Sequence, residues 1–535
     1  MVGWVGDADA GAWLVEATRA DVGRPAMAEL DTKITEAPGV LAGCVWYRSS
    51  GTVIAFRDRM GLVPLHLRHE PGTGGLVSTV AAHAWRAGDR APSPHLGQLA
   101  RFLCLSNDSG SDDYIKGVER IRPAEIHRFA PGRPQTRRRY WPQPAPPEGA
   151  AAAAERFRAT FDAAVAAAVS RRPTVVLMSG GLDSSALAST VALQRGATTK
   201  NPLDVASMIF PRTPACDESA ELDELEHRLP LRIHRFDMDN LWPLRDLSFY
   251  SKITDAGPCF HAGTEYEFAF RRLVTERLGP MALMKGIGAD QLLEVTRLRL
   301  AHSLWRRRHW GALLRAARRD PTRAQVSALL TMVAARMGLS ATLDWARSVR
   351  RRRSRRSTHW VLESRAPPSD PVPVGGEDQR AEQLFGRGWE HVCRMTREAA
   401  RFSGGPTLAP LLDHRLWELA FRLPPEVLRL GEQNKGLLRV AMAGRLPEHI
   451  RLRPKLKTFD KHVEKGLGLL GAHKVSRLFR RPRLAELGLI DVRAFLSAYE
   501  DYCRRVRGSV DSPTQVGSFP IWRTIAAELW LRAVA

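Results

Sequence analysis

Cysteine is scarce in this chain and widely scattered. The six cysteines among 535 residues form no Cys-x-x-Cys pair. The spacing therefore indicates neither a zinc site nor a disulfide framework. Free thiols fit a reducing compartment, so we expect the protein in the cytoplasm. The cysteines are Cys44, Cys104, Cys216, Cys259, Cys393 and Cys503.

Long apolar runs are also absent. No uninterrupted apolar stretch reaches the roughly 18 residues that a membrane-spanning helix needs, so we expect no membrane span. The segment Met1–Asp7 lacks the basic region and the apolar core of a secretory signal. Apolar residues make up 44% of the chain and charged residues 26%, which is typical of a globular protein. The length suggests two or three domains.

Acidic residues are few relative to basic ones. The chain has 80 Lys and Arg against 57 Asp and Glu, a net charge of +23, with arginine runs at 306–308 and 350–356. Such runs are found on surfaces that bind acidic partners, and they also arise from an arginine-rich coding bias on solvated faces. No recognition motif or aromatic stacking pattern accompanies them, so we expect no nucleic-acid partner.

One segment carries a specific chemical signature. The apolar run Val175–Met178 predicts a buried strand, and the motif SGGLDSS follows directly at residues 179–185. Glycines allow backbone N–H groups to approach a phosphate, and a helix N-terminus favours an anion. The Gly-Lys-Ser/Thr of a Walker loop is missing. The motif resembles the pyrophosphate loop of ATP pyrophosphatases, which cleave ATP to AMP and pyrophosphate.

Strand and helix patterns divide the chain into two regions. Residues up to about 141 are β-rich, with a predicted hairpin formed by 43–48 and 52–57. The Pro-rich segment 142–149 is typical of a linker. A predicted helix over 150–169 then leads into alternating strands and helices, which indicates an α/β fold with a parallel sheet. Its strands are expected at 175–178, 205–210, 232–236 and 281–285.

The second region places its loops at one edge of that sheet. Ligands of parallel sheets bind at the carboxyl ends of the strands, where we expect Ser179 and Gly286. After residue 295 the pattern is mostly helical, and the Pro- and Gly-rich segment 366–376 predicts a surface loop.

Ordered motifs over nearly the whole chain resemble the asparagine synthetases. The resemblance implies an inactive class II glutamine amidotransferase-like domain of the Ntn type over 1–141, then a linker over 142–149. It also implies an ATP-pyrophosphatase domain of the adenine nucleotide α-hydrolase type, with a helical C-terminal part, over 150–535. The matching segments are Arg57–Leu65, Ile115–Pro123, Tyr140-Trp141, SGGLDSS, Cys216–Ser219, Gly286–Asp290, Pro410–Arg415, Lys435–Arg439 and Arg453–Lys455.

Two departures from the asparagine synthetase pattern narrow the expected activity. These enzymes use a cysteine after the initiator Met to release ammonia from glutamine, whereas this sequence has Val2. Cys44 and Cys104 are internal, without a free α-amine, and we expect both to be packed in the interior. The glutamate of the family's Gly-x-Gly-x-Asp motif, a tyrosine in β-lactam synthetase, is Ile287 here.

The segment around Pro406 and Thr407 departs in the same way, because the synthetases carry an acidic Glu-Ala near this point. A missing base argues against β-lactam closure, whereas a peptide α-amine, with a pKa of about 7.7–8.0, is partly neutral near pH 7–8. We therefore expect a lasso-peptide cyclase that joins an Asp or Glu side chain of a leader-free core peptide to the N-terminal amine. A leader peptidase and a leader-binding protein are the expected partners.

Two alternatives stay open. One is an asparagine synthetase-like or β-lactam synthetase-like amide ligase that acts on a small molecule. The other is a degenerate scaffold that binds a nucleotide or a peptide without catalysis.

The resemblance implies ATP and Mg²⁺ as cofactors, with the following residue roles. Asp183 and Asp290 would hold Mg²⁺, although each also suits a helix N-cap. Lys435 would contact the pyrophosphate, and Lys455 would stabilise the charge of adenylation and of the tetrahedral intermediate. The expected ATP contacts are Ser179, Gly180, Gly181, Asp183, Ser184, Ser185, Met208, Gly286 and Gly288. The residues His261, Glu265 and Glu267 line the substrate cavity or pack on a helix face.

Overall fold

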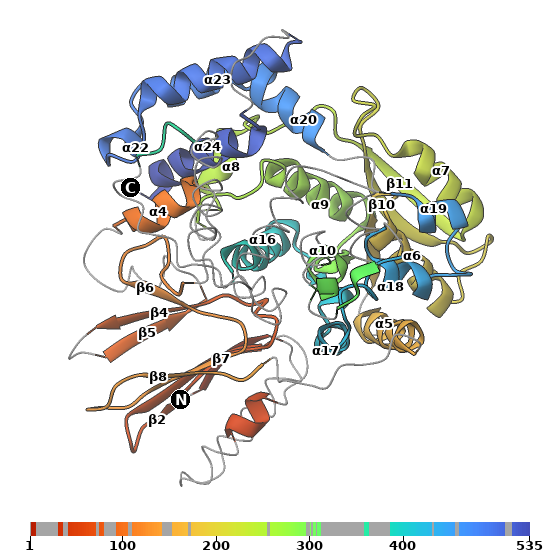
Figure 1. Ribbon diagram of the computed structural model, residues 1–535, viewed down its shortest axis with the longest axis horizontal. Helices are drawn as coiled ribbons and strands as arrows, with labels where there is room; N and C mark the ends of the chain where they lie inside the picture. The colour runs from red at the N-terminus through yellow and green to blue at the C-terminus, as the bar shows by residue number, and fades with distance from the viewer. Residues whose placement is uncertain are drawn as a thin grey trace.

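The computed structural model combines antiparallel sheets before residue 140 with a parallel sheet and helices after residue 152 (Figure 1). This is the α/β architecture that the sequence predicts. The predicted linker 142–149 lies outside the described residues, and the domain boundaries stay a prediction. The structure describes residues 2–6, 30–35, 41–70, 74–79, 93–104, 110–141, 152–169, 173–253, 257–295, 300, 303–305, 308–311, 358–362, 386–430, 433–454, 459–508 and 516–534.

Two antiparallel sheets form the N-terminal region. The predicted hairpin is confirmed, since β2 and β3 pair with Cys44 opposite Ala55. One sheet has the order β1-β2-β3-β7-β8 and the other has the order β5-β4-β6. Helix α4 (Leu96–Leu103) lies between β5 and β6 in the chain. The strands are β1 (Val2–Gly6), β2 (Leu41–Tyr47), β3 (Thr52–Arg57), β4 (Leu65–Glu70), β5 (Gly74–Ser78), β6 (Val118–Ile121), β7 (Glu125–Phe129) and β8 (Thr136–Arg139).

A five-stranded parallel sheet organises the second region. Its order is β11-β10-β9-β12-β13, so the chain builds outward on one side of β9 and then crosses to the other side. This reversal between β9 and β12 is the position where such sheets bind ligands. The four predicted strands are confirmed, and β13 is an addition. The bounds are β9 (Thr174–Met178), β10 (Leu203–Ile209), β11 (Leu231–Asp237), β12 (Ala282–Met284) and β13 (Thr407–Leu408).

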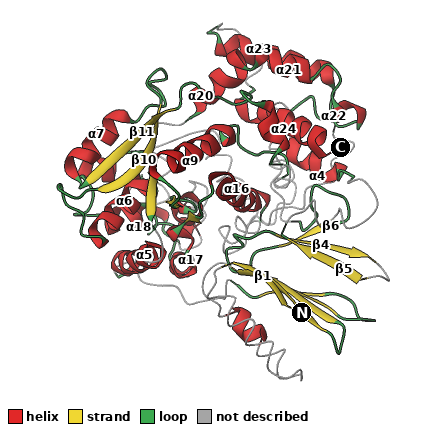
Figure 2. Cartoon of the chain, turned by 180° about the vertical axis from the view of Figure 1, so that it is seen from behind, coloured by secondary structure: helices red, strands yellow, loops and turns green. Residues whose placement is uncertain are grey.

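Strand β9 is buried on both faces, which explains its unbroken apolar sequence. Val175 and Leu177 pack in a cluster with helix α9 (Thr264–Leu278). Val176 and Met178 alternate with them and face helices on the other side of the sheet. Figure 2 shows α9 and α6 (Leu182–Gln194) on opposite sides of the yellow strands.

Helices make up most of the described chain after residue 295, as the pattern predicts, and the segments 350–356 and 366–376 lie outside the described residues. Helix α4 of the N-terminal region shares a hydrophobic cluster with the C-terminal helix α24. No described helix is long and apolar enough to cross a membrane. The remaining helices are α5 (Ala153–Val169), α7 (Ser219–Arg228), α8 (Leu247–Ser251), α10 (Ala289–Leu293), α16 (Arg387–Ser403), η3 (Pro410–Leu412), α17 (His414–Arg422), α18 (Gly436–Ala441), α19 (Glu448–Leu452), α20 (Asp460–Lys465), η4 (Gly466–Leu470), α21 (Ala472–Leu478), α22 (Arg483–Glu486), α23 (Val492–Val506) and α24 (Ser518–Val534).

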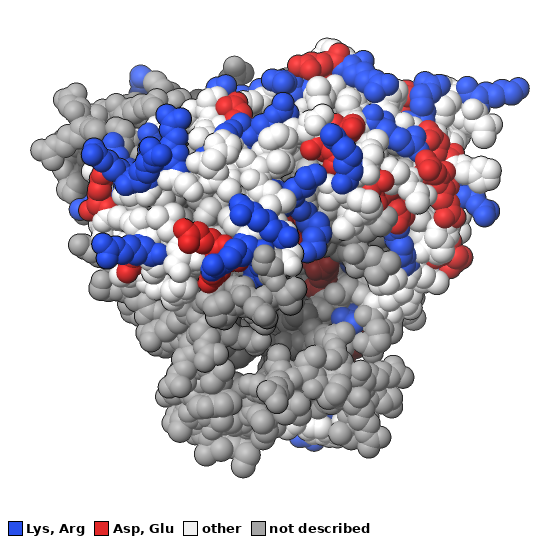
Figure 3. Space-filling model, turned by 90° about the horizontal axis from the view of Figure 1, so that it is seen from above, with Lys and Arg blue, Asp and Glu red and all other residues white. Residues whose placement is uncertain are grey.

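Basic side chains are spread over the helical face of the molecule. Figure 3 shows blue Lys and Arg side chains interspersed with red Asp and Glu across this face. Some pairs are local on one helix, such as the exposed pair of Lys461 with Glu464 on α20. Exposed pairs of this kind contribute little to stability.

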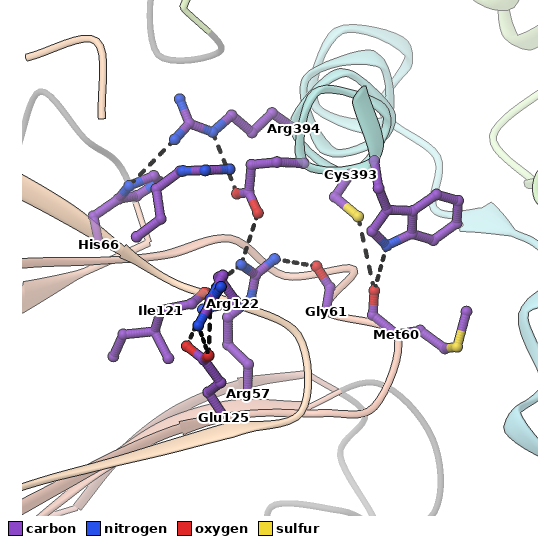
Figure 4. A network of polar contacts seen from close by, with 12 residues as sticks. Arg57, Met60, Gly61, His66, Ile121, Arg122, Glu125, Cys393 and Arg394 are labelled. Carbon is purple, nitrogen blue, oxygen red and sulfur yellow. Dashed lines mark hydrogen bonds and ion pairs between the residues drawn. The ribbon is translucent and has the colours of Figure 1, made fainter. Parts of the chain in front are cut away.

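Helix α16 joins the N-terminal sheets to the rest of the protein. Arg57, fully buried at the end of β3, donates a hydrogen bond of 2.8 Å from Nη1 to Glu390 Oε2 on α16. Trp389 Nε1 donates to the carbonyl of Met60 at 2.7 Å, and Arg394 pairs with the buried Asp113. Figure 4 shows Arg394 beside His66 and Arg57 beside Gly61. The Arg57–Leu65 motif therefore makes a buried polar interface with α16.

Candidate active site

The SGGLDSS loop lies where β9 ends and α6 begins. Gly181 is the N-cap of α6, so Asp183 belongs to the first helical turn and the N-cap alternative for it is wrong. Ser184 Oγ accepts a hydrogen bond of 3.1 Å from the amide of Ser179, which closes the loop on itself. Gly180 has φ +50°, and a Cβ there would lie 3.1 Å from Glu221 Cβ. The loop thus presents backbone at a helix N-terminus, as phosphate binding requires.

A second glycine loop follows β12 and approaches the first. A Cβ on Gly286 would lie 3.1 Å from Asp183 Cβ, so the two loops are in close contact. Gly288 has φ +93°, and a Cβ there would overlap Leu412 Cδ2. Gly288 is the N-cap of α10, so Asp290 is a first-turn residue and not the cap. The expectation that both loops share one sheet edge is confirmed.

Lys435 brings these loops together. Its Nζ lies 2.5 Å from Asp183 Oδ2, in ion-pair contact with Asp290, and 3.9 Å from Glu294 Oε1. Lys435 has φ +62° and caps α18, and its side chain is largely buried. Burial lowers the pKa of Lys435, but Asp183 and Asp290 outweigh this effect and raise it. The ammonium is therefore charged at neutral pH.

Glu294 is a site residue that the sequence reasoning missed. It follows Asp290 by four residues and is the C-cap of α10, which brings its side chain to Lys435. The i, i+4 spacing of two acidic residues after a Gly-x-Gly turn was the available signal.

The chemistry of this site fits a magnesium–triphosphate group. Asp183 and Asp290 offer carboxylate oxygens, the ligands that Mg²⁺ prefers. Among the described residues, no three His, Cys, Asp or Glu side chains are placed to hold a metal ion by themselves. This suits Mg²⁺, which usually takes one or two carboxylates and completes its shell with substrate phosphates and water. Gly180 and Gly286 let the loop backbones pack closely against their neighbours, and Lys435 supplies a compensating positive charge.

Arg453 braces the back of the nucleotide loop. Its Nη2 donates to the carbonyl of Gly180 at 3.0 Å, and its Nη1 lies 2.7 Å from Glu221 Oε1. In the matching segment Cys216–Ser219, Asp217 Oδ1 accepts a 2.8 Å bond from the amide of Phe210. These contacts hold the loop in shape. Lys455 lies outside the described residues, so its catalytic role stays a prediction.

The expected ATP contacts differ in burial, since Ser185 is buried and Met208 is half-buried. Ser185 is fully buried in α6, with its amide bonded to the carbonyl of Gly181 at 3.0 Å. Met208 is half-buried in β10, opposite Phe236 of β11 and close to the carboxyl end of the strand. Their contacts with ATP stay predictions.

The positions that depart from the synthetase pattern carry no acid or base. Ile287 is half-buried and packs against the main hydrophobic core. Thr407 lies in β13 and accepts a hydrogen bond from the buried Arg271. Cys44 and Cys104 are half-buried rather than fully packed in the interior, and burial raises the pKa of the Cys44 thiol to about 11. A thiol with that pKa is a poor nucleophile at neutral pH.

The three candidate cavity residues near the start of α9 separate into two groups. Glu265 accepts hydrogen bonds from the amide of Asp246 at 2.7 Å and from Tyr250 Oη at 3.0 Å, so it packs between helices. Glu267 instead pairs with Lys285 at the end of β12. His261 precedes α9 and is exposed to solvent.

A family model described as asparagine synthase matches residues 156–532, which span both glycine loops and Lys435. The chain belongs to the asparagine synthase family. The match supports an ATP-dependent carbon–nitrogen ligase that forms an amide, and members of this family use ATP with Mg²⁺. No curated protein matches the chain at a significant level.

Proposed function

We propose that this family member is a lasso-peptide cyclase. The enzyme activates an Asp or Glu side chain of a leader-free core peptide by joining it to the α-phosphate of ATP, and pyrophosphate leaves. The N-terminal amine of the same peptide then attacks the activated carbonyl carbon, AMP leaves, and a macrolactam ring closes around the threaded tail.

One combination of residues carries the proposal. The groups suited to ATP, namely Asp183, Asp290 and Lys435, converge at the sheet edge. At the same edge Ile287 replaces the acidic or phenolic residue of the synthetases, and it packs into the core. The chain therefore keeps the means of activating a carboxylate while lacking the family's usual base beside it. Among the internal cysteines, Cys44 is a weak nucleophile, which argues against glutamine as the nitrogen source.

The chemistry of a peptide α-amine as the nucleophile agrees with the absence of the family's usual base. A peptide α-amine has a pKa of about 7.7–8.0, so a substantial fraction is already neutral at pH 7–8. Side-chain amines and ammonia are far more protonated at this pH and depend more strongly on a base. Lys435 would meet the pyrophosphate, and Lys455 would stabilise the negative charge that develops on the carbonyl oxygen.

The direct test incubates the protein with ATP, Mg²⁺ and a series of leader-free peptides in which the Asp or Glu stands at different distances from the N-terminus. The proposal predicts a product lighter by one water, together with equal amounts of AMP and pyrophosphate. Amide formation from ammonia and a small carboxylic acid, with no peptide product, would instead identify a small-molecule ligase. Absence of AMP with every acid and amine would identify a scaffold. The leader peptidase and leader-binding protein are proposed partners and are not needed in this assay.

A further inference from the structure

A charged pair lies beside the second glycine loop and has no part in the proposed ATP site. Lys285 directly follows β12 and directly precedes Gly286, and its amide donates to the carbonyl of Leu408 at 2.9 Å. Its Nζ pairs with Glu267 in the first turn of α9. Because Gly286 touches Asp183, this pair lies next to the place where a carboxylate would be activated.

Solvent reaches the side chains of this pair. Glu267 and Lys285 expose 34% and 36% of their side chains, yet burial is the largest influence on the pKa of Glu267. His261 is likewise exposed, and burial lowers its pKa. Because Lys285 and Arg271 outweigh burial, the pKa of Glu267 falls below its ordinary value and the group stays ionised.

Aromatic rings fix the position of His261. Its ring centroid lies 5.2 Å from that of Phe260, 6.2 Å from that of His391 and 6.4 Å from that of Phe519. His391 Nε2 accepts a 3.1 Å hydrogen bond from the amide of Phe260, which ties the loop to α16. Below the loop, the Arg523 guanidinium lies 4.0 Å from the Phe260 ring centroid.

The charged groups around His261 set its protonation. Glu267 favours the imidazolium, while burial, Arg523 and Lys285 disfavour it, and the pKa of His261 is lowered. His391, which faces it from α16, has a pKa lowered well below the ordinary value because of burial and carries no charge at neutral pH. His261 is therefore a neutral imidazole near pH 7, able to accept a proton, with a carboxylate nearby to stabilise the imidazolium.

Ring closure needs such a group. When a neutral amine forms a bond to a carbonyl carbon, its nitrogen becomes positively charged and must lose a proton before or as AMP leaves. Ile287 cannot accept that proton, and Lys285 and Lys435 are paired with carboxylates. Two groups have the required chemistry: Glu267, which is paired with Lys285 directly before Gly286, and His261, which lies six residues before Glu267 at the start of α9.

We propose that Glu267 and His261 form the subsite for the attacking neutral amine, in which Glu267 stabilises the positive charge that develops on its nitrogen and His261 accepts its proton. The amine lone pair forms the C–N bond, the C–O bond to AMP breaks with its electrons on the phosphate oxygen, and His261 later returns the proton to water. Lys285 is a positioning residue that holds Glu267. This inference rests on the proposed cyclase function and adds the residues that handle the nucleophile.

The test separates carboxylate activation from amine attack in the full-length protein. His261→Gln and Glu267→Gln are compared with the wild type in two measurements. Pyrophosphate release in the presence of hydroxylamine, which traps the activated carboxylate, reports activation. Mass spectrometry of the macrolactam reports ring closure. We expect trapping within about twofold of wild type, and ring closure slower by about 10²–10³-fold in His261→Gln, the usual range for losing a general base. The matched controls are His473→Gln on α21 and Glu276→Gln on α9, both exposed.

The pH profile gives a second, independent readout. In the wild type, the rate of ring closure should rise with pH through the lowered pKa of His261 and again through the pKa of the peptide amine. In His261→Gln, the first of these two rises should be lost and the second should remain. Ring closure at the wild-type rate with an unchanged profile would overturn the subsite. Equal loss of trapping and closure in both variants would overturn it as well, because it would assign the residues to activation or folding. If the wild type itself activates no peptide, the proposed function fails and the subsite fails with it.

Discussion

At the scale of single residues, the candidate site is a set of balanced charges around Lys435. One ammonium contacts three carboxylates, Asp183, Asp290 and Glu294, on elements far apart in the sequence. Two of these carboxylates are also the groups best suited to Mg²⁺. A bound metal ion would contact the same two carboxylates as Lys435. We therefore expect magnesium–ATP to loosen the ion pairs of Lys435, because the residues of the site are already close together before it binds.

The first prediction concerns the metal-binding carboxylate. Asp183→Ala removes one expected Mg²⁺ ligand and leaves Lys435 less compensated, so AMP and pyrophosphate formation should fall by at least about 10²-fold. Pyrophosphate release measures this loss. The control is Asp223→Ala on α7, whose side chain is exposed at the surface. AMP formation at the wild-type rate in Asp183→Ala would mean that the loop is misread.

The second prediction compares two lysines in one basic stretch. Lys455→Ala should reduce ring closure by about 10²–10³-fold, because a fixed cation stabilises the charge of the tetrahedral intermediate. Lys457→Ala, two residues away, should retain nearly full activity. Product mass measured against time for both variants checks this difference, and equal rates for the two would remove the role assigned to Lys455.

The third prediction concerns backbone shape at the second loop. Gly288→Ala adds strain at φ +93° and an overlap with Leu412, and should lower the free energy of unfolding by about 2–4 kcal/mol. Gly488→Ala is the matched control, because Gly488 also has a positive φ, +66°, but has open space around it. Thermal unfolding should therefore show a smaller loss, of about 1 kcal/mol, for Gly488→Ala. Equal losses would show that contact with Leu412 is unimportant.

At the scale of elements, helix α16 connects the N-terminal sheets to the candidate site. Glu390 and Trp389 of this helix bond to Arg57 and Met60 of the N-terminal region. The next residue, His391, accepts a hydrogen bond from the amide of Phe260 and so holds the loop before α9. The N-terminal sheets therefore have a structural role, because their buried contacts fix the helix on which the loop rests.

The fourth prediction follows from the buried ion pair on α16. Burial alone would raise the pKa of Glu390, but Arg57 and Arg394 outweigh it and lower this pKa to about 2 from an ordinary value of 4.5. The pair therefore stabilises the fold above pH 4.5, and this stability is lost as the pH falls from 4.5 towards 2. Glu390→Gln should lower the unfolding free energy at pH 7 by about 3–5 kcal/mol and weaken the acid dependence in this range.

Thermal unfolding between pH 7 and 3 measures this effect. Glu276→Gln, which breaks an exposed pair with Arg272 on α9, should change the unfolding free energy by less than about 0.5 kcal/mol at any pH. An acid dependence in Glu390→Gln as steep as in the wild type would contradict the assignment of the pair.

The sequence predicted the elements whose pattern is local. The apolar run at β9, the glycine loop after it and the hairpin β2–β3 each have a signal within a few residues, and each is present. The two-residue strand β13 has no such signal, because it exists only through its pairing with β12. The bracing role of Arg453 was equally hidden, since its partners Gly180 and Glu221 lie more than 200 residues earlier.

At the scale of the whole molecule, the candidate site lies where the order of the parallel sheet reverses, and the N-terminal sheets are attached through α16 and α4 (Figure 1). This arrangement agrees with the family match over residues 156–532. The chain has a net charge of +23, and the described part of the face in Figure 3 carries basic side chains interspersed with acidic ones. We therefore attribute no specific partner to the charge of that face.

The measurement that tests the central claim most directly is the mass of a leader-free peptide after incubation with the protein, ATP and Mg²⁺. The account predicts one product lighter by one water, a link between an Asp or Glu side chain and the N-terminal amine, and one AMP and one pyrophosphate for each ring. An unchanged peptide together with ATP-dependent amide formation from ammonia or a small amine would contradict it.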